Sequence, residues 1–177
     1  MKKKRTAKQE RARLEGLGRY FDRSSVNEII GIETNPCLYI LMRSDLASLN
    51  PGKAMAQASH AANAMVHKVT ALRGDMARFG HLKKMYERWS TQTHQGFGTC
   101  LVLDCHSEQK MLDTLHSLHK ADESGAGILT EVIKDPTYPV RDGEITHFIS
   151  VNTCAYVFMD KNDDHLRAQL SFLDLYK

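Results

Sequence analysis

The chain has 177 residues, of which 42% are hydrophobic and 25% are charged, and its mean hydropathy is −0.42. These values are typical of a globular protein with a buried core, and no apolar run approaches the roughly 18 residues of a membrane span. Neither a signal peptide nor an internal repeat is visible, so we expect a cytoplasmic protein that contacts no membrane. The four cysteines lack C-x-x-C spacing, which favours buried free thiols over disulfides.

The net charge of +3 is unevenly distributed along the chain. Residues 1–25 contain nine Lys or Arg and three Asp or Glu, so the rest of the chain is net acidic. We predict a basic extension over residues 1–34, flexible or helical, followed by one domain over residues 35–177. Because cations release counterions from a phosphate backbone, the extension is suited to contact nucleic acid. The alternatives are a solubilising segment or a cap on the domain.

The domain begins with a predicted strand over residues 37–43, CLYILMR, whose continuous apolar run is typical of burial on both faces. A helix follows from Asn50 to about Arg73, because Asn50 is a good N-cap and Pro51 suits the first turn. The helical period predicts a buried arc of Met55, Ala58, Ala62, Met65, Val66 and Val69. The opposite, exposed arc contains Lys53, Gln57, His60 and His67, and Ser59 lies at the border.

Lys53 stands out in this helix, because the partial positive charge of a helix N-terminus disfavours a cation in the first turn. A local rule broken without evident gain often marks a functional site. Lys53 and the free backbone N–H groups of the first turn would together bind a phosphate or a developing oxyanion. The alternative is a solvated surface lysine whose flexible stem carries the charge away.

The rest of the chain predicts alternating strands and helices. Residues 75–95 predict a helix with Gly80 as a break and Trp89 as a packing anchor. A strand at 99–105 and a helix capped by Ser107 follow; the apolar stripe of that helix contains Met111, Leu112, Leu115 and Leu118. The last predicted elements are strands at 128–133 and 146–159 and a helix at 163–170.

Between the last two strands, the two prolines of Asp135-Pro136-Thr137-Tyr138-Pro139 predict an irregular loop. A strand that leads directly into a helix is typical of helices packed on a sheet. The order of elements therefore predicts an α/β fold, a three-layer α/β/α sandwich around a small, mostly parallel, mixed four-stranded sheet.

Two segments in register carry further motifs. They are Arg43-Ser44-Asp45-Leu46 at the end of the first strand and Gly52-Lys53-Ala54-Met55-Ala56-Gln57-Ala58-Ser59-His60-Ala61-Ala62 at the start of the long helix. They resemble the R-x-D-L and G-K-x-x-A-Q-x-S-H-A-A motifs that the type 2 peptidyl-tRNA hydrolases carry at the same places. The resemblance is strong over residues 38–65 and extends in outline over 37–177. It implies the same α/β/α fold and hydrolysis of the ester between a peptide and the terminal ribose of tRNA. It implies tRNA as the partner and no cofactor, and it is compatible with a homodimer.

The resemblance also implies the site residues. The catalytic set is Lys53, Gln57, Asp135 and His60. In this set Lys53 would stabilise charge, Gln57 would position water or the carbonyl, and Asp135 would handle protons or hold Lys53. The imidazole of His60 is a titrating candidate. Substrate contacts are expected from Ser59, Thr137, Asp45 and Arg43. The chain departs from the family after Asp135, where Pro-Thr-Tyr-Pro replaces the usual glycine, threonine and glutamine.

Other interpretations stay open. His116 and His119 share a helix face close to Cys105 and His106, but four well-spaced zinc ligands are not evident, so we expect no metal. A tRNA- or protein-binding module without turnover is an alternative function on the same fold. Hydrolysis of another acyl ester or amide is a third, because a fold does not fix the substrate.

Overall fold

The computed structural model describes residues 33–72, 76–123, 125 and 127–177. The predicted basic extension over residues 1–34 therefore lies outside the described residues, apart from its last two positions. The described elements, in chain order, are β1 (Pro36–Met42), α3 (Pro51–Ala71), α4 (Met76–Thr91), β2 (Cys100–Asp104), α5 (Glu108–Ala121), β3 (Leu129–Asp142), β4 (Ile145–Asp160) and α6 (Asp164–Ala168).

The strands form a four-stranded sheet in the order β2-β1-β4-β3. β1 pairs with β2 in parallel, whereas β4 pairs antiparallel with both β1 and β3. The predicted α/β class and the mixed four-stranded sheet are confirmed, but the expectation of a mostly parallel sheet is wrong. A tight hairpin joins β3 to β4 at Gly143, whose φ of 58° suits glycine, and strands joined by a hairpin run antiparallel.

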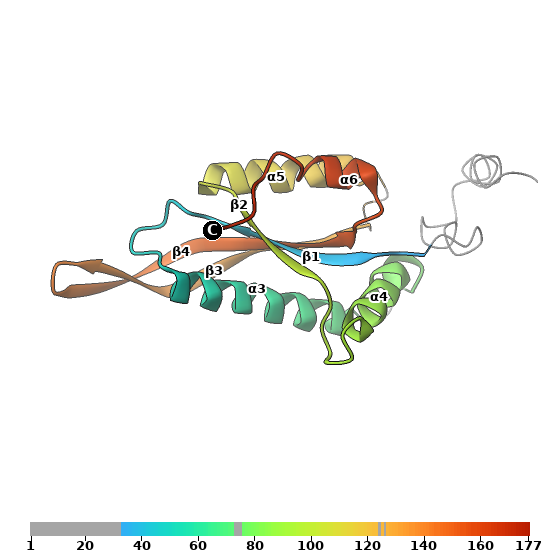
Figure 1. The fold of residues 1–177 in the computed structure, drawn as a ribbon, viewed down its shortest axis with the longest axis horizontal. Coiled ribbons are helices and arrows are strands. Elements are labelled where there is room, and N and C mark those ends of the chain that lie inside the picture. Colours follow the sequence, from blue (N-terminus) through green and yellow to red (C-terminus); the bar gives the residue numbers. More distant parts are fainter. Residues whose placement is uncertain (1–32, 73–75, 124, 126) are drawn as a thin grey trace, which may run out of the picture.

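Helices cover both faces of the sheet and complete the three predicted layers. α3 and α4 lie on one face, and α5 and α6 lie on the other (Figure 1). One hydrophobic cluster, with Met65 and Leu82, fills the space below α3 and α4, and a second, with Met111 and Leu118, fills the space below α5. All seven residues of β1 are buried, which confirms the predicted burial of this strand on both faces.

Helix α3 begins where the sequence predicts, because the Asn50 side chain accepts a hydrogen bond from the backbone N–H of Lys53 at 3.0 Å. Its buried face, however, is rotated from the predicted one and contains Ala54, Gln57, Ala61, Met65 and Val69. Met55, predicted to be buried, is 66% exposed, and Gln57, predicted to be exposed, is buried. Alanine is compatible with either environment, so an alanine-rich helix gives a weak pattern. Gln57 tolerates burial because its amide is hydrogen-bonded on both sides.

Strand β3 is longer than predicted, since it absorbs the segment Asp135–Pro139 that the prolines predict as a loop. The register against β4 shifts twice between Ile133 and Tyr138, and Pro136 has no partner in the ladder. Proline is tolerated at such a bulge and on an edge strand, where a missing N–H breaks no pairing. The predicted loop is therefore wrong, and its residues are fixed by the sheet.

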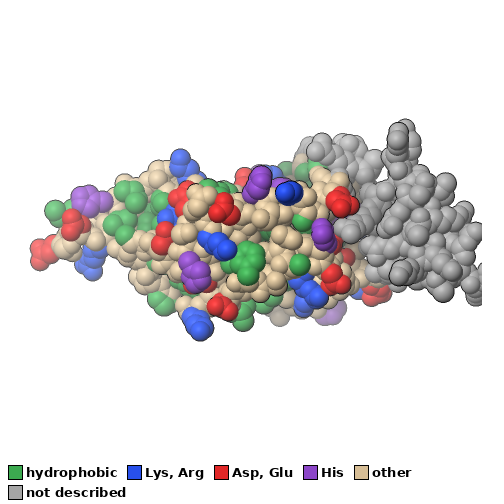
Figure 2. Space-filling view, turned by 90° about the horizontal axis from the view of Figure 1, so that it is seen from above, with side chains coloured by type: hydrophobic (Ala, Val, Ile, Leu, Met, Phe, Trp, Pro, Cys, Tyr) green, Lys and Arg blue, Asp and Glu red, His purple; other side chains and the backbone are tan. Residues whose placement is uncertain are grey.

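The far end of the β3–β4 hairpin extends past the helices that cover the sheet (Figure 1). Ile145, Phe148 and Ile149 in this end are 62%, 70% and 43% exposed. Figure 2 shows hydrophobic side chains at the same end of the molecule, interspersed with acidic, basic and histidine side chains. The base of the hairpin instead lies against the start of α3, and this contact positions the site.

The remaining helices differ from expectation in detail. Gly80 does not break α4, which runs from Met76 to Thr91, since a glycine inside a helix costs only about 1 kcal/mol. Trp89 is confirmed as a packing anchor, because it is 3% exposed and its Nε1 donates to the carbonyl oxygen of Thr99 at 2.8 Å. Leu112, predicted in the buried stripe of α5, is 38% exposed.

Candidate active site at the start of helix α3

Lys53 is held against β3 rather than in solvent. Its Nζ donates to the carbonyl oxygen of Pro139 at 2.5 Å and lies 4.9 Å from the centre of the Tyr138 ring. A carbonyl oxygen and an aromatic face both attract a cation, so they offset the repulsion that a helix N-terminus exerts on a lysine. The alternative of a freely solvated lysine is therefore wrong.

The loop before α3 fixes this end of the helix against β3. Ser48 has a φ of 60°, in the left-handed region, where a non-glycine residue costs about 1–3 kcal/mol. Its Oγ accepts a hydrogen bond from the backbone N–H of Arg141 at 3.1 Å. The strained turn thus joins the loop to the strand that carries Tyr138 and Pro139, and this junction sets where the ammonium of Lys53 lies.

One turn further along α3, Gln57 belongs to a buried polar chain. Its Nε2 donates to Oδ2 of Asp135 at 2.7 Å, and its Oε1 accepts from the hydroxyl of Thr153 at 2.7 Å. The other carboxylate oxygen of Asp135 accepts from the backbone N–H of Thr137 at 2.9 Å. Each bond limits the rotation of the next group, so the half-buried carboxylate of Asp135 has a fixed direction beside α3.

Tyr138 forms the inner wall below Lys53. The residue is fully buried, and its hydroxyl has no hydrogen-bond partner among the described residues. Burial raises the pKa of the phenol, nearby Tyr176 and Asp135 raise it further, and Arg43 opposes them. The phenol is therefore neutral near pH 7, so it offers Lys53 an uncharged aromatic face.

Arg43 and Asp45 form an internal brace at the end of β1. The guanidinium of Arg43 donates twice to the Asp45 carboxylate, at 2.8 and 3.1 Å, and its Nη1 donates to Glu108 at 2.7 Å and to the carbonyl oxygen of Asn152 at 2.8 Å. The hydrogen bonds from Arg43 hold the pKa of Asp45 below its usual range. The brace ties β1 to α5 and β4, and direct contact of either residue with a substrate stays a prediction.

The chain matches a known protein family over a range that contains these residues. A family model described as peptidyl-tRNA hydrolase PTH2 matches residues 37–152, which is more than half of the chain. The chain belongs to the PTH2 family. The resemblance seen in the sequence is thereby confirmed, and the matched range includes Lys53, Gln57 and Asp135. No curated protein matches the chain in a sequence comparison.

Of the residues predicted from the PTH2 family, Gln57, Asp135 and Thr137 are joined by hydrogen bonds. Lys53, one helical turn before Gln57, bonds to Pro139 of the same strand β3. Ser59 and His60 lie on the exposed surface of α3, outside this set of contacts. The hydroxyl of Ser59 donates to the carbonyl oxygen of Met55 at 3.0 Å, within the helix itself. Their predicted roles in the PTH2 reaction stay predictions.

Two residues of the site were not predicted from the sequence. Tyr138 was placed in a loop, and its inward direction depends on how β3 pairs with β4 beyond the bulge. Thr153 belongs to the apolar run of β4, where it is fully buried. A threonine in a fully buried strand needs a hydrogen-bond partner, and this was the signal that could have found it.

Other chemistry finds less support in the described residues. Burial raises the pKa of Cys37 to about 11 and that of both Cys105 and Cys154 to about 12, so these free thiols stay protonated near pH 7. Within the described ranges, no three His, Cys, Asp or Glu side chains are grouped to hold a metal ion. Nε2 of His119 instead lies 2.8 Å from the hydroxyl of Thr130. No helix in the described part of the chain is long and apolar enough to cross a membrane.

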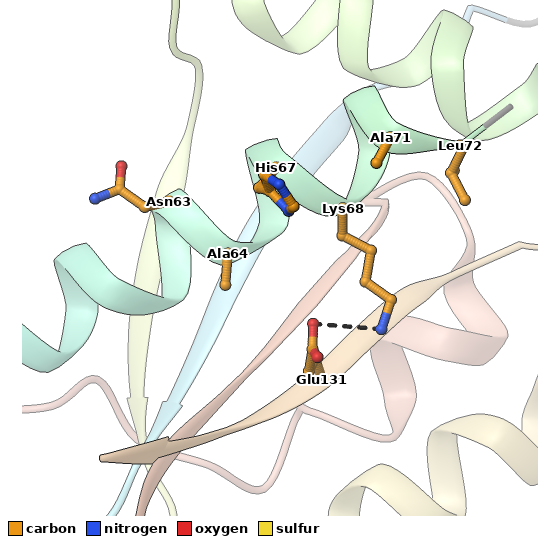
Figure 3. Close-up of a pocket in the computed structure, with 7 residues that line it drawn as sticks. All are labelled: Asn63, Ala64, His67, Lys68, Ala71, Leu72 and Glu131. Carbon is orange, nitrogen blue, oxygen red and sulfur yellow. Dashed lines mark ion pairs between the residues drawn. The ribbon is translucent and has the colours of Figure 1, made fainter. Parts of the chain in front are cut away.

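In the described part of the chain, two hollows border helix α3. The first, of about 440 Å³, lies beside its first two turns and is lined by Met42, Leu49, Asn50, Pro51, Ala54, Met55, Ala58, Val102, Tyr176 and Lys177. The second, of about 680 Å³, lies between the end of α3 and β3 and is lined by Asn63, Ala64, His67, Lys68, Ala71, Leu72 and Glu131 (Figure 3). In the second hollow the ammonium of Lys68 lies 3.3 Å from Glu131, whose carboxylate also accepts from Tyr156. Its charges therefore neutralise each other.

Proposed function

We propose that this member of the PTH2 family hydrolyses the ester bond of peptidyl-tRNA or N-blocked aminoacyl-tRNA, releasing free tRNA and the peptide. The observation that carries the proposal is that Lys53 and Gln57, one turn apart at the start of α3, both bond to β3, Lys53 to Pro139 and Gln57 to Asp135. Ester hydrolysis needs a positioned water, a base and a group that stabilises the tetrahedral oxyanion. A cytoplasmic location would follow from this substrate.

Lys53 is suited to stabilise the oxyanion. Pro51 has no N–H, and the N–H of Lys53 is bonded to Asn50, so the N–H of Gly52 is the donor that the first turn can direct at a substrate. An ammonium and a backbone N–H at a helix N-terminus both favour the negative oxygen that forms when water adds to the ester carbonyl.

Asp135 is suited to accept the proton of the attacking water. Its carboxylate is half-buried, and Gln57 and Thr137 fix its direction through hydrogen bonds. When the tetrahedral species collapses, the bond between the carbonyl carbon and the ribose oxygen breaks, and the proton held by Asp135 can pass to that oxygen. The products are a peptide carboxylic acid and a tRNA with a free terminal hydroxyl.

The direct test is incubation of the purified protein with N-acetyl-aminoacyl-tRNA. We expect release of free tRNA in proportion to the amount of protein and unchanged by a strong chelator, because no step of the proposed reaction uses a metal. The same tRNA carrying an aminoacyl group with a free amino group tests whether the protein recognises the block on that amino group.

A binding module without turnover is the second candidate function. It is favoured by the engagement of both charged groups: Lys53 donates to Pro139, and Asp135 accepts from Gln57 and Thr137. A protein that binds N-acetyl-aminoacyl-tRNA at micromolar concentrations but releases no tRNA would decide for this candidate.

A further inference from the structure

The apolar hollow beside the first two turns of α3 has no part in the chemistry proposed above. Its walls come from Ala54 and Ala58 of α3, Met42 of β1, Val102 of β2 and Tyr176. Its volume of about 440 Å³ lies within the range of roughly 300–1,000 Å³ that is typical of small-molecule sites. The hollow also lies near the carboxyl ends of the parallel strands β1 and β2, where open α/β sheets commonly bind ligands.

This hollow and Lys53 lie on opposite flanks of one helix end. At 100° per residue, Ala54, Met55 and Ala58 point to the flank that faces β2, whereas Lys53 and Gln57 point to the flank that faces β3. The two flanks meet at Asn50 and the first turn. A helix with its side chains is about 10–12 Å across, and an extended residue spans about 3.3–3.6 Å. Two extended residues span about 7 Å, and the side chain of the second reaches further. A chain whose ester lies at Lys53 therefore crosses the helix end and reaches the hollow with the side chain of its second residue.

The two halves of the substrate differ in polarity, as the two flanks of the helix do. The tRNA half brings phosphates, which suit the flank with Lys53 and, at intervals of seven residues, His60 and His67. The acyl half brings amino-acid side chains, which suit an apolar cavity. We propose that the hollow binds an apolar side chain of the peptidyl group, in the second residue from the ester. This inference rests on the proposed function.

The test measures kcat/KM on one tRNA charged with either N-acetyl-leucyl-alanine or N-acetylglycyl-alanine, in which leucine or glycine is the second residue from the ester. We expect the wild type to prefer the leucyl substrate by about 10-fold or more, as pockets for apolar side chains do. Ala58→Phe fills the hollow and should remove the preference by slowing the leucyl substrate alone. The control His116→Phe adds the same side chain at an exposed position of α5, on the other face of the sheet, and should leave both rates unchanged.

A second variant covers the case in which Ala58→Phe does not fold. Met55 lies at the hollow and is 66% exposed, so Met55→Asp is compatible with the fold and should lower the preference by placing a charge beside the apolar walls. Equal rates on both substrates in the wild type, or an equal loss on both in the variants, would overturn the inference. So would a change of oligomeric state in either variant with the preference intact, which would assign the hollow to a protein interface.

Failure of the proposed function is distinguishable from failure of this inference. If the wild type cleaves neither substrate, the binding of adenosine 3′-amides of N-acetyl-leucyl-alanine and N-acetylglycyl-alanine is measured by calorimetry. Tighter binding of the leucyl amide that Ala58→Phe abolishes would support the hollow as an acyl site, and equal or absent binding would overturn it.

Discussion

The two flanks of helix α3 differ in how they are packed: one is filled by hydrogen-bonded polar groups, and the other borders an apolar hollow. On the flank facing β3, a buried amide is matched by Thr153 and Asp135, although an apolar side chain at Gln57 would need no partners. On the flank facing β2, the small side chains of Ala54 and Ala58 leave an apolar hollow. The difference indicates that the first flank fixes the direction of polar groups, whereas the second keeps space free.

The largest effect is expected from removing the charge on the polar flank. In Asp135→Asn, the amide of Gln57 can turn over and keep a hydrogen bond, so the fold should keep its melting temperature within a few degrees. Because the proposed base is lost, kcat should fall by about 10²-fold or more. Asp113→Asn, at an exposed position of α5, is the matched control. A kcat for Asp135→Asn within threefold of the wild type would remove Asp135 from the proposed reaction.

A double variant separates two roles of Gln57, namely fixing the direction of the Asp135 carboxylate and stabilising the fold. Gln57→Leu leaves the buried hydroxyl of Thr153 with two weak acceptors, the carbonyl oxygen of Ile133 at 3.3 Å and Sγ of Cys154 at 3.9 Å. The free energy of unfolding should therefore fall by about 1 kcal/mol. Adding Thr153→Val removes that hydroxyl and should restore most of the stability. Activity should fall in the single variant and stay low in the double one. If activity returned together with stability, the role of Gln57 would be structural.

Tyr138 offers a smaller test of the same flank. Tyr138→Phe removes a buried hydroxyl without a partner, so it should stabilise the protein by about 1 kcal/mol and keep kcat. Tyr138→Leu removes the aromatic face and should lower kcat by several-fold while KM stays unchanged. Since the pKa of Tyr138 is raised in the folded state, its contribution to stability is lost as pH rises above about 10, the ordinary tyrosine value. Between pH 8 and 11, the melting temperature should therefore fall less for Tyr138→Phe than for the wild type.

The smallest effect concerns residues outside the described part of the chain. We predict that deleting residues 1–32, which carry the excess of basic residues, weakens tRNA binding and flattens the slope of log affinity against log salt concentration. Titrations of labelled tRNA at several salt concentrations would measure both. The same slope with and without the extension would refute its contact with phosphates.

The sequence predicted the parts of the site that depend on local rules. Asn50 caps α3 as expected, and the motif around Lys53 and Gln57 located the family and the helix end. What it could not predict depends on pairing between distant segments. The burial of Gln57 is decided by two partners on β3 and β4, and the inward direction of Tyr138 is decided by register shifts that free Pro136 from the ladder. Local proline rules predicted a loop there, and the sheet edge overrode them.

The most direct test of the account compares two lysines of α3. Lys53 and Lys68 lie on the same helix, and both reach β3, but Lys53 contacts Pro139 and Tyr138 at the proposed active site, whereas Lys68 pairs with Glu131 in the second hollow. On N-acetyl-aminoacyl-tRNA, Lys53→Ala should lower kcat by about 10²-fold or more, as the loss of one oxyanion donor does. Lys68→Ala should keep kcat within twofold of the wild type. Equal rates for the two variants, both close to that of the wild type, would contradict the proposed active site.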